Sequence, residues 1–205
     1  NEVSNSAYSI IGAGELNKIT GTTKSIIGAG EQNKIFNSEQ SNISAGKFNE
    51  IIENTWYSNI GAGTDNVIKG NSSYSSIAAG GSNLMTNSSS GSKTKYSFIG
   101  AGTYNILSGA SWSTIVSGIG NKIIDTGDTP GAILTGQYNL IKDSEFTAIV
   151  NGKNNTINGM SFDSSAVIGA DDRVVDRSHT TFMEGLDVDT NRGGAGNAQA
   201  FKYHG

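Results

Sequence analysis

The chain offers few side chains for catalysis, and the densest group lies towards its C-terminal end. Two histidines are present, His179 and His204. Asp176, Ser178 and His179 supply the residue types of a nucleophilic triad, in which a histidine base activates a serine. Three near-neighbours in sequence rarely reach triad geometry, and no G-x-S-x-G elbow surrounds this serine. We therefore predict no catalytic residue here.

Acidic residues gather in the same region, and carboxylates are ligands for hard cations such as calcium. They are Asp171, Asp172, Asp176, Glu184, Asp187 and Asp189. Their spacing matches neither an EF-hand loop nor a glycine-aspartate calcium roll. Because Arg173 and Arg177 lie among them, we expect surface ion pairs, and we predict no metal site and no cofactor.

Paired acids and glycine-rich loops would indicate two further chemistries. Glu15 and Glu31 occupy the same position of a repeat, but later copies carry Lys47 or Thr64 there. A continuous acid-lined groove for glycoside cleavage is therefore not expected. The recurring Gly-Ala-Gly lacks the strand–loop–helix context of a nucleotide-binding loop. We expect a protein that is not an enzyme.

Aromatic residues form the pattern most typical of a binding surface. An aromatic side chain often precedes the first serine of a repeat, as at Tyr8, Tyr57, Tyr74, Tyr96 and Trp112, and Phe146 precedes Thr147. Aligned along the protein, such side chains could bind a host-surface glycan or a protein receptor, since aromatic rings anchor interfaces. We favour the alternative, packing between neighbouring chains or successive loops, because the aromatic position keeps step with the repeat. The candidate surface-binding residues are Trp56, Tyr57, Tyr74, Tyr96 and Trp112. The Ser-rich segment 86–96, with Lys93 and Lys95, is the best candidate for an exposed contact loop.

A repeat of constant length positions all of these residues. Its core, S-x-I-x-A-G-x-x-N-x-I, occurs at 9–19, 25–35, 41–51, 58–68, 75–85, 97–107 and 113–123, with looser copies at 131–141 and 147–157 and a degenerate copy at 165–175. The marker glycines are Gly14, Gly30, Gly46, Gly63, Gly80, Gly102, Gly118, Gly136 and Gly152, spaced 16, 16, 17, 17, 22, 16, 18 and 16 residues apart. A constant core with connections of variable length is the behaviour of a solenoid.

Each repeated position has a physical interpretation. Alternation in S-x-I-x-A indicates a strand whose repeated residues face inward, so Ile27 and Ala29 should stack under Ile43 and Ala45. The glycine supplies a turn that needs positive φ or close backbone approach. The asparagines are Asn17, Asn33, Asn49, Asn66, Asn83, Asn105, Asn121, Asn139 and Asn155. We expect a structural ladder of hydrogen bonds between coils rather than a ligand-binding row.

Composition supports strands and excludes several classes. The 205 residues include 28 glycines, one proline, 23 isoleucines and 6 leucines, an excess typical of strands joined by tight turns. The net charge is −4 and no basic patch stands out in the sequence, so we expect no general affinity for nucleic acid. The absence of cysteine excludes disulfides. We expect no membrane span, because no run of eighteen apolar residues occurs.

The predicted fold is therefore all-β, a parallel β-solenoid of about ten 16–18-residue rungs over residues 1–177, followed by a closing segment and Gly-rich tail at 178–205. Asn1-Glu2-Val3 fits the end of one more repeat, so we expect the chain to start mid-repeat within a longer parent. Two strands of four or five residues per coil enclose a thin core. Thin cores usually need oligomerisation, and we expect a homo-oligomer, most simply a trimer about one axis.

The repeat resembles the head repeats of trimeric autotransporter adhesins, and the same style of repeat occurs in bacteriophage tail fibres. The resemblance covers about residues 1–175, although the A-G-x-x-N step is about one residue longer than in adhesin heads. The segment TTFMEGLDVDT at 180–190 is similar to segments that close the repeat regions of phage-type fibres. The resemblance implies an extended trimeric fibre outside the cell, on a virion or a bacterial surface, with a binding or spacer role.

Two other functions are weighed against a fibre or adhesin. A polysaccharide depolymerase on a β-solenoid would need longer coils and an acid-lined groove. An ice-binding solenoid would need a regular ladder on a flat face, whereas the outward positions vary, as in Ile26, Asn42 and Phe98. The sequence therefore favours a non-enzymatic shaft or receptor-binding head.

Overall fold

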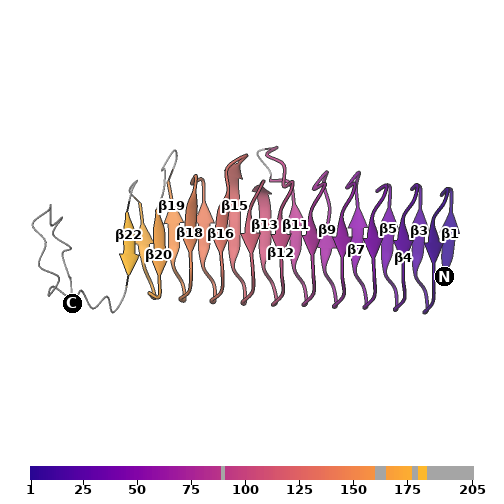
Figure 1. Ribbon diagram of the computed structural model, residues 1–205, viewed down its shortest axis with the longest axis horizontal. Helices are drawn as coiled ribbons and strands as arrows, with labels where there is room; N and C mark the ends of the chain where they lie inside the picture. Colours follow the sequence, from indigo (N-terminus) through magenta and orange to yellow (C-terminus); the bar gives the residue numbers. More distant parts are fainter. Residues whose placement is uncertain (89–90, 160–164, 177–179, 184–205) are drawn as a thin grey trace, which may run out of the picture.

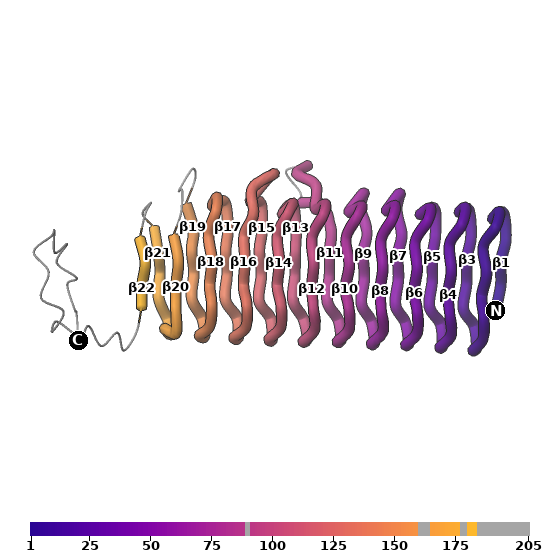
Figure 2. Tube along the Cα trace, in the orientation of Figure 1, coloured from indigo at the N-terminus to yellow at the C-terminus, as the bar shows by residue number. Residues whose placement is uncertain are grey.

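The protein is a parallel β-solenoid, seen in a computed structural model that describes residues 1–88, 91–159, 165–176 and 180–183 (Figure 1). The chain winds into coils that follow one another along the long axis, so the two ends of the described chain lie at opposite ends of a rod (Figure 2). Over these ranges the secondary structure consists of strands and turns, without helix. No helix able to cross a membrane therefore occurs in the described ranges.

Odd-numbered strands form one eleven-stranded sheet and even-numbered strands form the other. The odd sheet contains β1 (Glu2–Ser4), β3 (Lys18–Thr20), β5 (Lys34–Phe36), β7 (Glu50–Ile52), β9 (Val67–Ile68), β11 (Leu84–Thr86), β13 (Ile106–Ala110), β15 (Lys122–Gly127), β17 (Leu140–Lys142), β19 (Thr156–Asn158) and β21 (Val174–Val175). The even sheet contains β2 (Ile10–Ile11), β4 (Ile26–Ile27), β6 (Asn42–Ile43), β8 (Asn59–Ile60), β10 (Ser76–Ile77), β12 (Phe98–Ile99), β14 (Thr114–Ile115), β16 (Gly131–Ile133), β18 (Thr147–Ile149), β20 (Ala166–Ile168) and β22 (Thr181–Met183).

The repeat sets the register of both sheets. Each strand pairs in parallel with the strand one coil away, and equivalent residues are partners, as in Ile27 with Ile43 and Ile35 with Ile51. The expected parallel β-solenoid is confirmed, with eleven strands in each sheet against about ten predicted rungs. At about 4.8 Å between strands, the rod is roughly 50 Å long.

The core consists of two facing columns of branched side chains, one from each sheet. Ile19, Ile35 and Ile51 are fully buried on the odd strands, and Ile27, Ile43 and Ile60 on the even strands. Each strand thus contributes a single large core residue. Because a coil buries so few apolar atoms, its stability depends on stacking against its neighbours.

The strands are shorter than predicted, and this changes the environment of the repeated alanine. Most even strands contain only two residues, and Ala29 and Ala45 lie just beyond the strand end, half-buried rather than inside the core. The shortening arises because residues with left-handed backbone end the extended segments, among them Gly30 (φ 109°) and Gln32 (φ 54°). The repeated serine, in contrast, is buried, and Ser25 Oγ donates to the Ser38 carbonyl oxygen (3.0 Å).

The marker glycine is required by the stacking of coils. Gly102 has a φ of 92°, and a Cβ added there would collide with the carbonyl oxygen of Gly118 on the next coil. The residue that directly follows each marker glycine pairs with the equivalent residue of a neighbouring coil in a single parallel bridge. These nine residues form one column, from Glu15 to Lys153. The corner therefore acts as a third, narrow ladder between the two sheets.

The sheet continues past residue 177, the predicted end of the repeat region. Strand β22 pairs with β20, and its Phe182 occupies the core register of Val167. Phe182 is 37% exposed because no further described coil covers it. Most of the predicted closing segment, residues 184–205, lies outside the described residues.

Candidate binding surface

Four aromatic side chains on successive coils form a stacked column, which we call the aromatic ladder: Tyr57, Tyr74, Tyr96 and Trp112. Neighbouring ring centroids lie 4.8, 4.9 and 4.4 Å apart, and the ring planes differ by 8°, 15° and 15°. These separations match the spacing of about 4.8 Å between adjacent strands. The side chains remain accessible, each tyrosine at 47% and Trp112 at 56%.

The backbone holds each ring at the corner where the chain enters an even-numbered strand. All four residues have φ between 54° and 58°, a left-handed conformation that costs a non-glycine residue about 1–2 kcal/mol. The Tyr74 amide donates to the Trp56 carbonyl oxygen (2.9 Å) and the Trp112 amide to that of Lys95 (2.8 Å). Each amide is therefore tied to the preceding coil, and the following serine is buried. The sequence pattern thus aligns the rings through the backbone.

Stacking determines how a partner can contact the ladder. Tyr74 and Tyr96 have a ring on each side, so both of their faces are occupied. Tyr57 and Trp112 have a ring on one side only, and the next residues of the column beyond them are Gln40 and Pro130. Along the rest of the ladder, a partner would meet ring edges and phenolic hydroxyl groups repeated at the coil spacing.

The other predicted contact residues lie outside the stack. Trp56 is 47% exposed, and its described contacts include no ring stacking with the ladder. Tyr8 and Phe146 have the same backbone conformation and are exposed, but Lys24, Gln40 and Pro130 separate them from the ladder in the column.

The predicted contact loop at 86–96 is partly anchored. Thr94 is buried, and its hydroxyl donates to the Thr86 carbonyl oxygen (2.7 Å). Lys93 is exposed and Lys95 is half-buried. Residues 89 and 90 lie outside the described residues. The described part of the loop returns the chain to Tyr96, where the ladder resumes.

The repeated asparagines form a buried hydrogen-bonded ladder. At Asn83, Oδ1 accepts from the Asn105 amide and from Asn105 Nδ2, both at 3.1 Å. Asn83 Nδ2 donates to Asn66 Oδ1 (3.0 Å), the Gly102 carbonyl oxygen (2.9 Å) and the Ala79 carbonyl oxygen (3.3 Å). Asn1 begins this series, because its Oδ1 accepts from the Asn17 amide (3.1 Å). These amide groups bind other coils, so they do not offer a row of free ligands.

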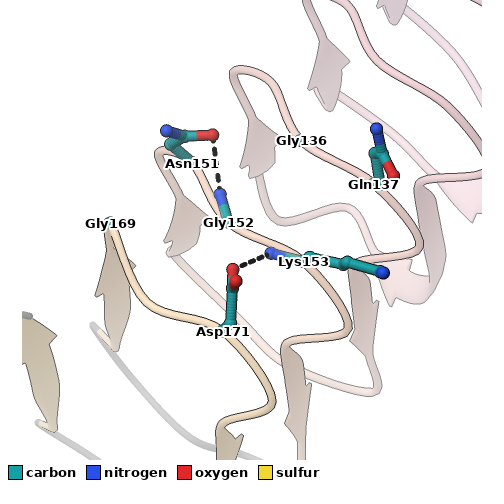
Figure 3. A pocket seen from close by; sticks show the side chains of 7 residues that line it. All are labelled: Gly136, Gln137, Asn151, Gly152, Lys153, Gly169 and Asp171. Atoms are coloured by element: carbon teal, nitrogen blue, oxygen red, sulfur yellow. Dashed lines mark hydrogen bonds between the residues drawn. The ribbon is translucent and has the colours of Figure 1, made fainter.

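A shallow hollow of about 340 Å³ lies near the C-terminal end, lined by Gly136, Gln137, Asn151, Gly152, Lys153, Gly169 and Asp171 (Figure 3). Asp171 Oδ1 accepts from the Lys153 amide (2.6 Å), while the Lys153 side chain points away from that carboxylate (Figure 3). Asp171 therefore replaces the carbonyl acceptor used on earlier coils. The carboxylate therefore ends the corner ladder.

Only part of the acidic region, in which surface ion pairs were expected, lies among the described residues. Asp172 Oδ1 accepts from Asn154 Nδ2 (2.9 Å), and no ion pair joins Arg173 to Asp171 or Asp172. In the described part of the chain, no three acidic or histidine side chains come together to hold a metal ion. Arg177, Ser178 and His179, and the acids from Glu184 onwards, lie outside the described residues.

The comparison with known proteins gives no relative from which a function could be inferred. No protein-family model matches the chain, and no similar sequence was found among curated proteins.

Proposed function

We propose that the chain is a non-enzymatic structural segment of an extracellular fibre, acting as the shaft or receptor-binding head of a phage tail fibre or cell-surface adhesin. The observation that carries this proposal is the unbroken strand pairing from β1 to β21 and from β2 to β22. Hydrogen bonds between coils run along the rod, and the buried asparagines add side-chain bonds in the same direction. Such a rod can hold a contact surface far from its attachment point.

The proposed working form is a homo-oligomer of parallel rods, with three chains as the expected number. Each strand from β3 to β21 buries one large apolar side chain, so a single coil has little core of its own. Association would bury further apolar surface along the length of the rod and stiffen it. This form also suits an elongated fibre, because closed rotational symmetry about the rod axis leaves both ends available.

In a receptor-binding head, the aromatic ladder is the proposed contact surface for a glycan or protein. Tyrosine and tryptophan combine apolar area with a hydrogen-bonding group, which favours them at binding sites. Trp112 has the highest exposure in the ladder and an end position, so it should contribute most.

The proposal can be tested on an array of cell-surface and capsular polysaccharides. Binding of the protein and release of reducing ends are measured on the same samples. A head should bind without cleavage, and Trp112→Ala should lose binding while Tyr138→Ala, which alters an exposed aromatic outside the ladder, should retain it. A shaft should neither bind nor cleave but should sediment as an elongated oligomer. Release of reducing ends by the purified protein would overturn the proposal.

A further inference from the structure

The outward side chains of the two sheets differ in charge. For each even-numbered strand from β2 to β20, one outward residue precedes the core residue and one follows it. Together these outward residues form what we call the uncharged face: Ile10, Gly12, Ile26, Gly28, Asn42, Ser44, Asn59, Gly61, Ser76, Ala78, Phe98, Gly100, Thr114, Val116, Ala132, Leu134, Ala148, Val150, Ala166 and Ile168. No member carries a charge. The corresponding positions of the odd sheet include Glu2, Lys18, Lys34, Glu50, Lys69, Lys122, Lys142 and Asp176.

The charged sheet has the contacts of a surface exposed to water. Lys18 Nζ lies 3.0 Å from Glu2 Oε2, and Lys34 Nζ lies 3.8 Å from Glu50 Oε1. The bond from Lys18 holds the pKa of Glu2 below its usual value. The uncharged face instead exposes large apolar groups, with Ile10 at 60%, Val116 at 47% and Leu134 at 42%. Exposed apolar groups of this kind, on both sides of the polar Asn42, Asn59 and Ser76, indicate an interaction site.

Side-chain volume on the uncharged face is also distributed as in a packed interface. Towards the N-terminal end, the bulky residue precedes the core position and the small one follows it, as in Phe98 and Gly100. Towards the C-terminal end the order is reversed, as in Ala132 and Leu134 or Ala166 and Ile168. The small glycines have a local cause, since a Cβ at Gly100 would collide with the Val116 carbonyl oxygen. Ala132, Ala148 and Ala166 are also paired with bulky residues, as expected where the volume above a sheet is limited by a packed partner.

We infer that copies of this chain pack against one another through the uncharged face. This inference rests on the proposed fibre function, but it takes a pair of rods as the unit in place of the expected three chains, because a self-complementary face joins two copies. At about 4.8 Å per strand and 3.3 Å per residue, ten strands of three residues each give a face of roughly 48 by 10 Å, or about 480 Å² per chain. Two such faces cover about 960 Å², close to the roughly 1,000 Å² expected of a specific interface. The aromatic ladder lies at the edge of this face.

A second copy is the occupant that this face fits best. Two sheets can pack face to face at about 10 Å, with side chains interdigitating. When two rods are related by a two-fold axis along their length, the position before the core residue faces the position after it on the partner. Phe98 would then lie opposite Gly100 of the second copy, and Ala132 opposite Leu134. The bulky and small columns are therefore complementary to themselves.

Charge insertion tests the assignment on the native chain. Ala148→Lys places a lysine on the uncharged face, and Thr156→Lys places one on the odd sheet of the same coil, and both sites are half-buried. Light scattering after size exclusion should give the unchanged chain a mass at a multiple of 21.3 kDa. Ala148→Lys should reduce it to 21.3 kDa, while Thr156→Lys should retain the oligomer. A monomeric native chain, or an oligomer unaffected by Ala148→Lys, would overturn the inference.

Single cysteines give a readout that does not require a disruptive substitution. The chain contains no cysteine, so each variant carries one thiol. A short bifunctional maleimide should cross-link copies of Ala148→Cys but not copies of Thr156→Cys, provided that the rods are parallel. Efficient cross-linking at Thr156→Cys alone would place the interface on the charged sheet and overturn the inference. A monomer that still binds glycans would refute this interface while leaving the proposed receptor-binding function intact.

Discussion

Replacing Asn83 by alanine tests how much the buried asparagine ladder contributes to stability. The substitution removes the only described acceptor of the Asn105 amide, which is buried. An unsatisfied buried donor costs about 1–3 kcal/mol, and each lost hydrogen bond about 1 kcal/mol net. Asn83 also loses its bonds to Asn66, Gly102 and Ala79. We expect Asn83→Ala to lower the free energy of unfolding by about 3–5 kcal/mol, allowing for partial relaxation around the site.

Denaturant unfolding followed by circular dichroism measures this loss, at fixed protein concentration because association adds to stability. Thr64→Ala is the matched control, since Thr64 lies at the same corner on an adjacent coil, in the column that contains Gly81, but is exposed. The control should change stability by less than about 0.5 kcal/mol. A loss below about 1 kcal/mol for Asn83→Ala would refute the argument that these bonds hold successive coils together.

Three further variants test the core, the turn and the polarity of the ladder. Ile123→Ala should cost about 2–5 kcal/mol because Ile123 is fully buried, whereas its outward neighbour Ile124→Ala should cost less than about 1 kcal/mol in the same unfolding assay. Gly102→Ala should prevent coil stacking, while Gly91→Ala, which also has positive φ but open space around it, should cost only about 1 kcal/mol by thermal melting. In Asn83→Asp, burial should raise the pKa of the new carboxyl group above its unfolded value of about 3.9. The variant should therefore be most stable below that pH and lose stability as pH rises through the folded-state pKa, as measured by denaturant unfolding at several pH values.

The repeat predicted the parallel solenoid and the residues that face the core because every coil supplies the same alternation. Strand length was harder to predict. Residues such as Gln32 and Tyr74 have left-handed backbone without being glycine or asparagine, so their types do not signal the corner. The half-buried environment of Ala29 follows from that early corner.

The candidate surface was partly visible in the sequence. The recurrence of an aromatic before a serine indicates an aligned column, and Tyr57, Tyr74, Tyr96 and Trp112 do stack. The occupied ring faces could not be inferred, because they depend on the angle at which each ring leaves its corner. The residues of the uncharged face occupy the variable positions of S-x-I-x-A. Their shared lack of charge is seen only when these positions are compared across all repeats.

The division between inward and outward positions explains how one rod can combine stability with a variable surface. The inward serine, isoleucine and asparagine supply the bonds and packing between coils, so they recur with little change. The outward residues on either side of Ile99 or Ile133 make no comparable contribution to the stability of the coil. Their residue types can therefore vary to fit the surface of a partner. If Ala148→Lys dissociates the oligomer while each chain keeps the circular dichroism signal of its strands, folding and association are separable properties of the same strands. If the chain unfolds with the oligomer, the thin core depends on its neighbours, and association is then part of folding.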